Sequence, residues 1–362
     1  MPPTDSDKSA SSTPTANRHF KKGAWILAAG LAGIVALLYY RFRRSPFDWN
    51  VFLATFAGVN WIWLLSSILL ILFTYGGRAL RWEVMLRPRE TKPSFWNITS
   101  ATVIGFTAIF LLGRPGELVR PYLISLKERV PFSSQMAAWL LERIFDLLAV
   151  LLIFGFSLAR IPASDLPLGP ALRWVLQTGG YLVAGLGAVC LLVLLVFRSF
   201  SDFAEHRIMS ALTFLPDSAR LRIAKAITAF SEGMRVTRNP ANLALLCFYT
   251  LLEWAIIVGS LFAFFRAFPV TAAFSLTDVM IFVGFVAFGS IVQIPGIGGG
   301  GQVVAIVVLT QIFGMSLEAA TGIALLNWIL SFVIVVPFGL VLGFHEGLNW
   351  RKLRHLSEDV AA

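Results

Sequence analysis

The chain has 362 residues, of which 57% are apolar or aromatic and 14% are charged, and its mean hydropathy is +0.75. Because soluble domains carry roughly 25% charged residues, this composition excludes a disordered chain and argues against a water-soluble enzyme. In a membrane protein the net charge of +10 is primarily a guide to topology, because basic residues collect on the cytoplasmic side. The two cysteines, Cys190 and Cys247, lie in separate apolar runs, so we expect neither a disulfide framework nor a metal site.

Residues 1–22 are rich in Ser, Thr, Pro and Asp, and we expect them to form a disordered cytoplasmic tail rather than a cleaved signal peptide. Nine apolar segments follow, at residues 24–40, 60–77, 95–112, 134–158, 175–197, 241–265, 276–294, 302–313 and 319–344. Each segment that spans a bilayer must be helical, because only a helix satisfies its own backbone in lipid. Residues 23–346 therefore form one predicted membrane domain, and residues 347–362 form a second cytoplasmic tail.

Two places interrupt the helical pattern. The first break contains Gly113, Pro115 and Gly116. The second break contains Pro295, Gly296, Gly298, Gly299, Gly300 and Gly301. Proline and clustered glycine end helices, and at membrane depth such a break persists only where protein or a wet cavity surrounds it. Each break is followed by a Glu or Gln and a second helix, a pattern typical of inverted repeats with a site near the bilayer midplane.

The distribution of Lys and Arg favours a topology with two re-entrant hairpins. If residues 95–123 enter and leave from the cytoplasm and residues 276–314 enter and leave from outside, 21 basic residues lie inside, six outside and three at membrane depth. Arg78 and Arg81 are among those counted inside. The three at depth are Arg114, Arg120 and Arg143. The sequence thus predicts an all-α polytopic protein with six full transmembrane helices, two opposed re-entrant hairpins and cytoplasmic termini.

The loop at residues 198–240 carries seven Lys and Arg residues and has the pattern of amphipathic helices. We expect it to lie on the cytoplasmic side against anionic phospholipids. Nucleic acid is not an expected partner, because no recognisable binding module is present and the basic residues flank membrane segments. The oligomeric state stays open, with a homodimer as one alternative.

Arg114, Glu117 and Arg120 form the first cluster of charges at membrane depth. Glu117 lies three residues from each arginine, so on a helix all three share one face, with a formal sum of +1. Guanidinium groups beside a helix N-terminus at Pro115 suit a phosphate oxygen. The functional interpretation is a lipid phosphate site, and the structural alternative is a self-neutralised anchor for the hairpin at the membrane interface.

Glu142, Arg143 and Asp146 form the second cluster, within the segment 134–158. Glu142 and Asp146 share a helix face, and Arg143 lies three residues before Asp146. The cluster is either an internal ion pair that joins this helix to a neighbour, a counter-charge to the first cluster, or a site for a cationic headgroup. No nucleophile or metal set accompanies the two carboxylates, so acid–base catalysis is not expected.

Two further polar positions lie near or inside apolar segments. Gln302 follows the run Gly298–Gly301, whose backbone either forms an anion nest or permits close helix packing. Glu253 is a single acid within the segment 241–265. It is a candidate for proton coupling, with a hydrogen bond to a neighbouring helix as the alternative.

Three stretches, Gly113–Pro121, Glu142–Asp146 and Pro295–Gln302, occur in this order. Together they resemble the lysylphosphatidylglycerol synthase transmembrane family, a flippase-like membrane domain of bacteria and archaea, over residues 24–345. The resemblance implies a cytoplasmic-membrane domain that moves an aminoacylated or otherwise modified lipid between leaflets. Relatives linked to polyprenyl glycan or envelope lipid pathways leave the substrate open.

The chain departs from the family pattern in two respects. The late loop often ends in glutamate, whereas Gln302 stands there and Ile297 replaces a glycine, which puts a proton- or amine-binding role at residue 302 in doubt. The soluble aminoacyl-transferase domain of the full synthases does not follow the last segment, so we do not expect synthesis of the aminoacyl lipid.

The leading hypothesis is a flippase, not an enzyme, without cofactor or metal. Its midplane site holds a phosphate-bearing lipid headgroup through Arg114 and Arg120, while Glu142 and Asp146 balance the charge. The alternative is a membrane-embedded enzyme or accessory subunit in lipid-linked glycan or envelope lipid synthesis, and a third hypothesis is a structural scaffold. The four histidines are scattered along the chain, which argues against a metal-dependent enzyme.

Cysteine labelling tests the predicted topology. In a variant whose two native cysteines are replaced, a cysteine at Ser45 is expected to react with a membrane-impermeant maleimide from outside intact cells. A cysteine at Ser218 is expected to react only after the membrane is opened, because it lies in the cytoplasmic loop. Labelling of both positions from the same side would overturn the arrangement.

Overall fold

A computed structural model describes most of the predicted membrane domain. The described residues are 47–86, 93–161, 170–199, 235–291, 293–294 and 298–346, with five single positions between 225 and 233. Internal contacts divide the chain into two units, residues 1–50 and 51–362, and the helices from α3 onward belong to the second unit. The two predicted tails, the predicted span 24–40 and most of the loop 198–240 lie outside the described residues.

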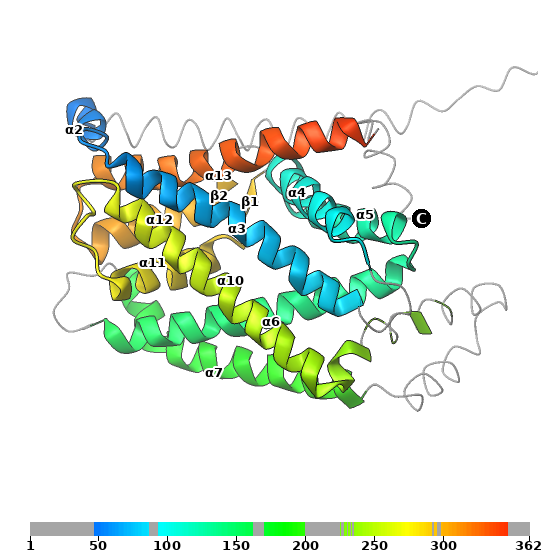
Figure 1. Ribbon diagram of the computed structural model, residues 1–362. Helices are drawn as coiled ribbons and strands as arrows, with labels where there is room; N and C mark the ends of the chain where they lie inside the picture. Colours follow the sequence, from blue (N-terminus) through cyan, green and yellow to red (C-terminus); the bar gives the residue numbers. More distant parts are fainter. Residues whose placement is uncertain are drawn as a thin grey trace, which may run out of the picture. The chain divides into compact units, whose positions relative to one another are not determined.

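Helices make up nearly all of the described structure (Figure 1). In chain order they are α2 (Trp49–Ala54), α3 (Trp61–Leu86), α4 (Phe95–Leu112), η1 (Arg114–Leu118), α5 (Val119–Lys127), α6 (Phe132–Arg160), α7 (Pro170–Ser199), η2 (Arg235–Arg238), α10 (Pro240–Arg266), α11 (Leu276–Gly289), α12 (Gly300–Gln311) and α13 (Leu317–His345). The only strands among the described residues are β1 (Gln293–Ile294) and β2 (Gly298–Gly299), which pair antiparallel.

Five of the described helices, α3, α4, α7, α10 and α13, are long and apolar enough to span a membrane. Helix α6 has 29 residues, a length of roughly 43 Å at 1.5 Å per residue, but its apolar stretch is interrupted by charges. Large apolar side chains such as Phe73, Leu192 and Phe344 are exposed on the helices, as contact with lipid requires. The prediction of an all-helical polytopic membrane protein is confirmed at this level.

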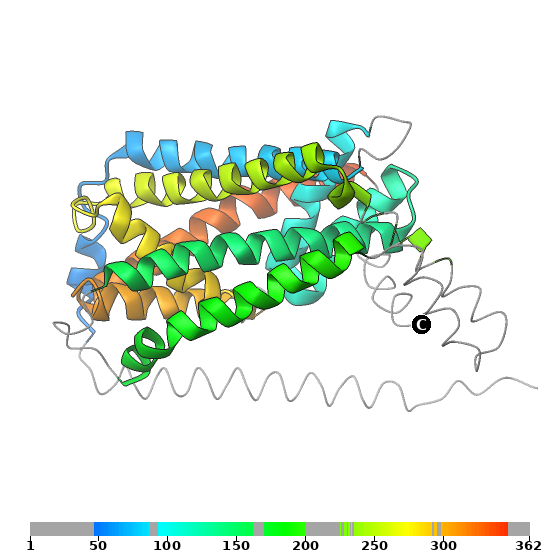
Figure 2. The same cartoon turned by 90° about the horizontal axis from the view of Figure 1, so that it is seen from below.

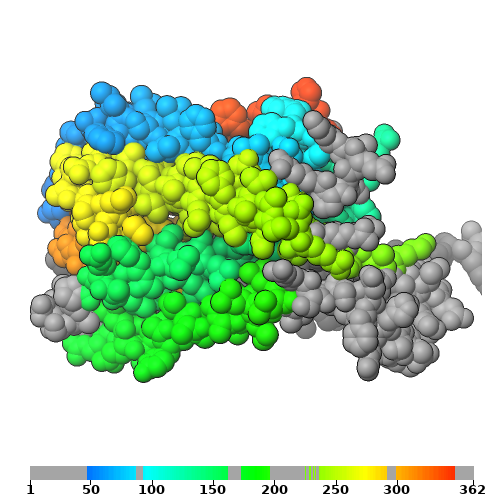
Figure 3. All heavy atoms as spheres, turned by 60° about the horizontal axis from the view of Figure 1, so that its bottom comes forward, coloured from blue at the N-terminus to red at the C-terminus, as the bar shows by residue number. Residues whose placement is uncertain are grey.

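The long helices run alongside one another. Figure 2 shows α3, α6, α7 and α10 extended in similar directions, and α3 packs along α10 while α6 packs on α7. On the face shown in Figure 3, α3, α10 and the pair α6 and α7 lie in successive bands. Lipid-facing side chains therefore surround an interior in which polar groups can be withdrawn from the bilayer.

The first hairpin runs from α4 through η1 to α5. Ser94 caps α4 by accepting a hydrogen bond from the backbone N–H of Asn97 (3.4 Å), and the helix ends at Gly113, whose φ of 71° favours glycine. The short helix η1 then begins at Arg114, with Pro115 in its first turn. Helix α5 packs closely on α4 at Gly105. A Cβ atom added to this glycine would lie only 2.5 Å from the Cβ atom of Arg120. The helix break thus lies where the sequence predicts it.

The second hairpin joins α11 to α12 through the β1–β2 pair. Ser275 and Asp278 form a capping box that begins α11. In the break, Gln293 pairs with Gly299 and Ile294 with Gly298, while Pro295 and Gly296 lie outside the described residues. The two helices pack on each other, with Gly301 against the side chain of Ser290, so the glycine run permits close packing, one of the two alternatives considered for it.

The prediction of a cytoplasmic loop that begins at residue 78 is wrong, because helix α3 continues beyond this residue. The sequence ends the apolar segment at Gly77, but the helix continues to Leu86 because Ala79, Trp82 and Met85 extend its buried face at helical spacing. Arg78 and Arg81 therefore lie within the helix bundle and not in a cytoplasmic loop. The number of arginines inside the bundle rises from the predicted three to five.

Replacement of Gly105 by alanine tests the close contact between α4 and α5. The added methyl group would collide with Arg120, so we expect Gly105→Ala to lower the free energy of unfolding by about 1–3 kcal/mol. The control is Gly76→Ala in α3, where no atom lies within 4 Å of the added Cβ and stability should be unchanged or higher. Thermal unfolding in detergent measures both, and equal melting temperatures for the two variants would contradict the packing.

Candidate functional site

Arg81 is the centre of a buried ion network that joins α3 to α6 and α10. Its side chain has no exposed surface, and its Nη1 donates hydrogen bonds to Asp146 Oδ1 (2.6 Å) and Thr250 Oγ1 (3.2 Å). Its Nη2 donates to Glu142 Oε1 (2.6 Å) and lies 3.3 Å from Glu253 Oε2. One guanidinium therefore contacts three carboxylates from two helices.

Glu142 occupies the other side of this centre and is itself fully buried. Its Oε1 accepts from Arg81 and from Arg143 (3.1 Å), and its Oε2 accepts from the indole N–H of Trp82 and from Arg120. Such a set of charge-assisted bonds offsets the large cost of burying a carboxylate. Glu142 thus ties α3, α5 and α6 together.

Two further contacts complete the network. Arg78 Nε lies 2.9 Å from Glu253 Oε1, and Arg143 Nη2 lies 3.1 Å from Asp146 Oδ2. The internal ion pair considered for α6 is therefore present, and Glu253 is ion-paired to the neighbouring helix α3. The roles of these residues toward a headgroup or a proton stay predictions.

The network borders a cavity of about 410 Å³ between the two hairpins, α6 and α10. Its charged lining is evenly divided in sign. The arginines are Arg78, Arg114 and Arg143, and the carboxylates are Glu117, Asp146 and Glu253. With the buried Arg81, Arg120 and Glu142 behind this lining, five arginines face four carboxylates, a formal excess of one positive charge.

Two buried donors at the cavity have neither a hydrogen-bond partner nor an ion-pair contact in the described part of the chain. They are Nε of Arg143 and the indole Nε1 of Trp254, and both residues line the cavity. A buried donor without an acceptor costs about 1–3 kcal/mol. The cavity is therefore suited to a ligand that brings acceptor atoms.

Arg114 connects the two hairpins at the cavity. It donates to the carbonyl oxygen of Ile291 from Nε (3.1 Å) and Nη2 (2.6 Å), and its Nη1 donates to Glu117 Oε1 (2.5 Å). Its side chain is 48% exposed and that of Arg143 is 37% exposed, whereas the side chains of Arg78, Arg81 and Arg120 are largely buried. The expected pairing of Arg114 with Glu117 is present.

Arg120 does not share this face, contrary to the expectation for the first cluster. It points instead to Glu142 and lies over the ring of Trp82, with 4.6 Å between its Cζ and the ring centroid. The reason is the local helix type: η1 has three residues per turn, which aligns Arg114 with Glu117, whereas Arg120 belongs to α5 and is turned toward α6. Arg120 borders only a space of about 10 Å³.

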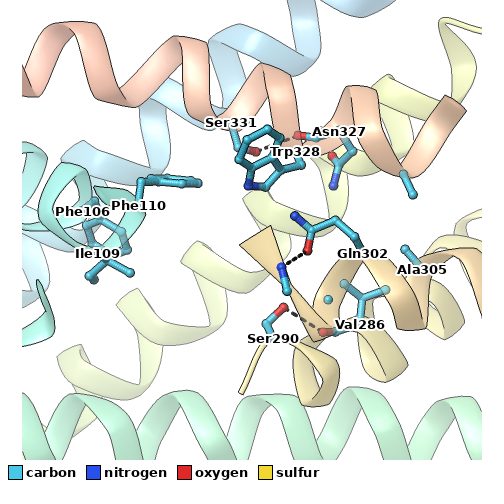
Figure 4. A pocket seen from close by; sticks show the side chains of 13 residues that line it. Phe106, Ile109, Phe110, Val286, Ser290, Gln302, Ala305, Asn327, Trp328 and Ser331 are labelled. Atoms are coloured by element: carbon cyan, nitrogen blue, oxygen red, sulfur yellow. Dashed lines mark hydrogen bonds between the residues drawn. The ribbon is translucent and has the colours of Figure 1, made fainter. Parts of the chain in front are cut away.

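Gln302 has a structural contact and also lines a second cavity. Its side-chain carbonyl accepts a hydrogen bond from the N–H of Gly299 (2.6 Å) and so caps the start of α12. Glutamine can supply this acceptor as well as glutamate, which gives the departure from the family pattern a physical explanation. The second cavity, of about 280 Å³, lies between α4, α11, α12 and α13 (Figure 4).

The sequence did not identify Arg78, Arg81, Trp82 or Trp254 as members of the site. The available signal was the apolar face of α3, which continues past both arginines to Leu86. In the described part of the chain no group of His, Cys, Asp and Glu side chains could hold a metal ion.

Substitution of Arg81 tests the importance of the network for folding. Arg81→Met removes a buried ion-pair partner from Glu142, Asp146 and Glu253, so we expect the free energy of unfolding to fall by about 3–5 kcal/mol. Arg160→Met is the control, because Arg160 lies exposed at the end of α6, over the ring of Phe156. Thermal unfolding in detergent measures the stability of both variants. Equal melting temperatures would show that the network does not stabilise the fold.

Comparison with known proteins agrees with the predicted resemblance. Glycosyltransferase AglD of Haloferax volcanii is 26% identical over 199 residues, which are 50% of this chain and 32% of that protein, so the chain spans about a third of AglD. UPF0104 membrane protein of Methanothermobacter thermautotrophicus is 25% identical over 312 residues, 84% of this chain and 89% of that protein. No solved structure matches. Since the family described as the lysylphosphatidylglycerol synthase TM region matches residues 25–339, the chain belongs to that family.

Proposed function

We propose that the protein is a lipid transporter that moves a phosphate-bearing headgroup between the leaflets of a bacterial or archaeal cytoplasmic membrane. The observation that carries this proposal is the cavity of about 410 Å³, which three arginines line inside a membrane helix bundle. Charges inside a membrane domain are costly to retain and typically mark a substrate path. Family membership agrees with an integral membrane role.

The charge count favours an anionic ligand. The nine charged residues of the site have a formal excess of one positive charge, and a phosphodiester carries one negative charge. The two unpartnered donors, Arg143 Nε and Trp254 Nε1, also require acceptor oxygens. Guanidinium groups bind phosphate oxygens through paired N–H donors. We therefore assign phosphate contact to Arg114 and Arg143, with Trp254 as an added donor.

This assignment revises the predicted pair of phosphate ligands. Arg120 is 5% exposed and held by Glu142, so we assign it to the structural network and not to the ligand. The predicted helix N-terminus at Pro115 is replaced by η1, which has five residues and is too short for a substantial helix dipole. The phosphate site therefore depends on side chains.

The proposed topology has six full spans and two opposed hairpins, with both termini in the cytoplasm. Two observations support it. The α4–α5 hairpin and the α11–α12 hairpin lie toward opposite ends of the long helices (Figures 1 and 2), and Arg114 joins the ends of the two hairpins through Ile291. The headgroup would cross through the cavity between them while its acyl chains remain in lipid.

One comparison favours a second candidate function. The relative AglD is named a glycosyltransferase, which supports a membrane-embedded enzyme or an accessory subunit acting on a lipid-linked sugar. Formation of a new lipid product by the purified protein would distinguish this candidate from transport, since a transporter leaves the lipid chemically unchanged.

A vesicle assay tests the transport proposal. Phosphatidylglycerol with a fluorescent acyl chain is reconstituted with the protein, and dithionite quenching measures its movement between leaflets. We expect Arg114→Ala together with Arg143→Ala to slow this movement by about tenfold to a hundredfold, because a hydrogen bond to a charged group contributes about 1.5–3 kcal/mol.

Arg160→Ala is the control for this assay, because it removes an arginine that lies outside the cavity lining. Vesicles without protein give the uncatalysed rate. Translocation at the same rate in the double variant and in the control would contradict the assigned site, and a wild-type rate equal to that of empty vesicles would contradict transport of this lipid.

A further inference from the structure

The second cavity adjoins the cavity proposed for the phosphate. Phe106 and Ile109 of α4, Val286 of α11 and Ser290, which caps the end of α11, line both spaces, so the two are neighbouring compartments with a shared wall. The second has a volume of about 280 Å³, close to the lower end of the range of small-molecule sites, roughly 300–1,000 Å³. Groups bound in the two compartments would therefore lie next to each other.

The second cavity differs from the first in charge. Among the described residues that line it, none is charged, and its polar side chains besides the indole of Trp328 are the amides of Gln302 and Asn327 and the hydroxyls of Ser290 and Ser331. These four side chains come from α12, from α13 and from the residue that caps the end of α11, and they converge on one space (Figure 4). Neutral polar groups inside a membrane domain require hydrogen-bond partners as charged ones do.

Hydrogen-bonding capacity remains free on these side chains. The carbonyl of Gln302 is occupied by Gly299, which leaves its amide nitrogen as a donor on the side toward Trp328 (Figure 4). The Asn327 amide has no hydrogen-bond partner within the described ranges. Ser331 donates to the carbonyl oxygen of Asn327 (3.0 Å) and Ser290 to that of Val286 (2.9 Å), so both hydroxyl oxygens can still accept.

Aromatic rings form the remaining part of this wall. Trp328 of α13 and Phe110 of α4 line the cavity, and Phe332 packs against both rings, with centroid separations of 5.3 Å and 5.9 Å. Such rings present flat apolar surfaces whose orientation is fixed by packing.

Donor amides, acceptor hydroxyls and flat aromatic surfaces together match a polyhydroxylated group. Each hydroxyl of such a group both donates and accepts, and its C–H surface packs on an aromatic ring. An ammonium group would find an aromatic face but no carboxylate on the described lining of this cavity. The lining therefore favours a neutral polyol over a cationic headgroup.

We infer that the second cavity is the subsite for a neutral polyhydroxylated group, such as glycerol, inositol or a sugar, that is joined to the phosphate of the transported lipid. This inference rests on the proposed function for the position of the phosphate. It identifies the substrate class as a phospholipid or lipid phosphate with a hydroxylated headgroup.

Binding of short-chain lipids to the purified full-length protein in detergent tests the inference. The probes are dihexanoyl forms of phosphatidylinositol, phosphatidic acid and phosphatidylethanolamine, which share the phosphate and differ in the attached group. We expect phosphatidylinositol to bind about tenfold more tightly than the other two, because several hydrogen bonds are added in the second cavity.

Two variants of the second cavity sharpen the test. Asn327→Leu keeps the side-chain size and removes the amide, so it should abolish the preference for phosphatidylinositol. Phosphatidic acid should bind to this variant as it binds to the wild type, which also shows that the variant is folded. Gln302→Glu keeps an acceptor for Gly299 and removes the donor, and it should reduce the preference in the same direction. Arg143→Ala should weaken the binding of all three lipids by the same factor.

The outcomes separate the inference from the proposed function. Equal wild-type affinity for phosphatidylinositol and phosphatidic acid, tightest binding of phosphatidylethanolamine, or an unchanged preference in Asn327→Leu would overturn the polyol subsite, even if Arg143→Ala weakens all lipids. If Arg143→Ala has no effect but Asn327→Leu removes the preference, the phosphate assignment fails and the polyol subsite stands.

Discussion

Arg81 places a full positive charge inside a helix bundle, and the arrangement of the surrounding helices follows from the need to satisfy it. Its partners come from α6 and α10, helices that are separated from α3 by long stretches of sequence. A shift of one helix by a turn would leave a buried charge without its partner, at about 3–5 kcal/mol. Relative to apolar packing such a network adds little net stability, so its main effect is to specify one register of α3 against α6 and α10.

The same network divides the charged residues into two groups. Arg81, Arg120 and Glu142 lie behind the cavity wall, where each is ion-paired with its neighbours. Arg114 and Arg143 lie at the cavity with 48% and 37% of their side chains exposed. Arg143 belongs to both groups, because its Nη2 contacts Glu142 and Asp146 while its Nε has no partner in the described part of the chain. Ion pairing that fixes the helices accounts for the first group, and contact with an anionic ligand is the proposed role of the second.

The helices and their breaks were predictable because lipid allows few backbone solutions and because Gly113 and Pro115 end a helix for local reasons. The pairing of Glu142, Arg143 and Asp146 on one helix also follows from local spacing. The role of Arg81 could not be predicted from local spacing. Its partners lie 61 and 65 residues away in α6 and 169 residues away in α10, and no local pattern contains them. The orientation of Arg120 was missed for another reason, because the change from a 3₁₀ to an α-helix between Arg114 and Arg120 alters the face on which each side chain lies.

These differences in burial also decide where the structure can change at low cost. Separating Arg81 from Glu142 would expose two buried charges to an apolar environment, at several kcal/mol. The contact of Arg114 with the carbonyl oxygen of Ile291 joins a half-exposed guanidinium to a backbone group. Water or a phosphate oxygen can replace that carbonyl as the acceptor. The cost is close to that of losing an ordinary hydrogen bond, about 0.5–1.5 kcal/mol. A lipid phosphate that reaches the cavity would thus exchange partners with Arg114 before it disturbs α3, α6 or α10.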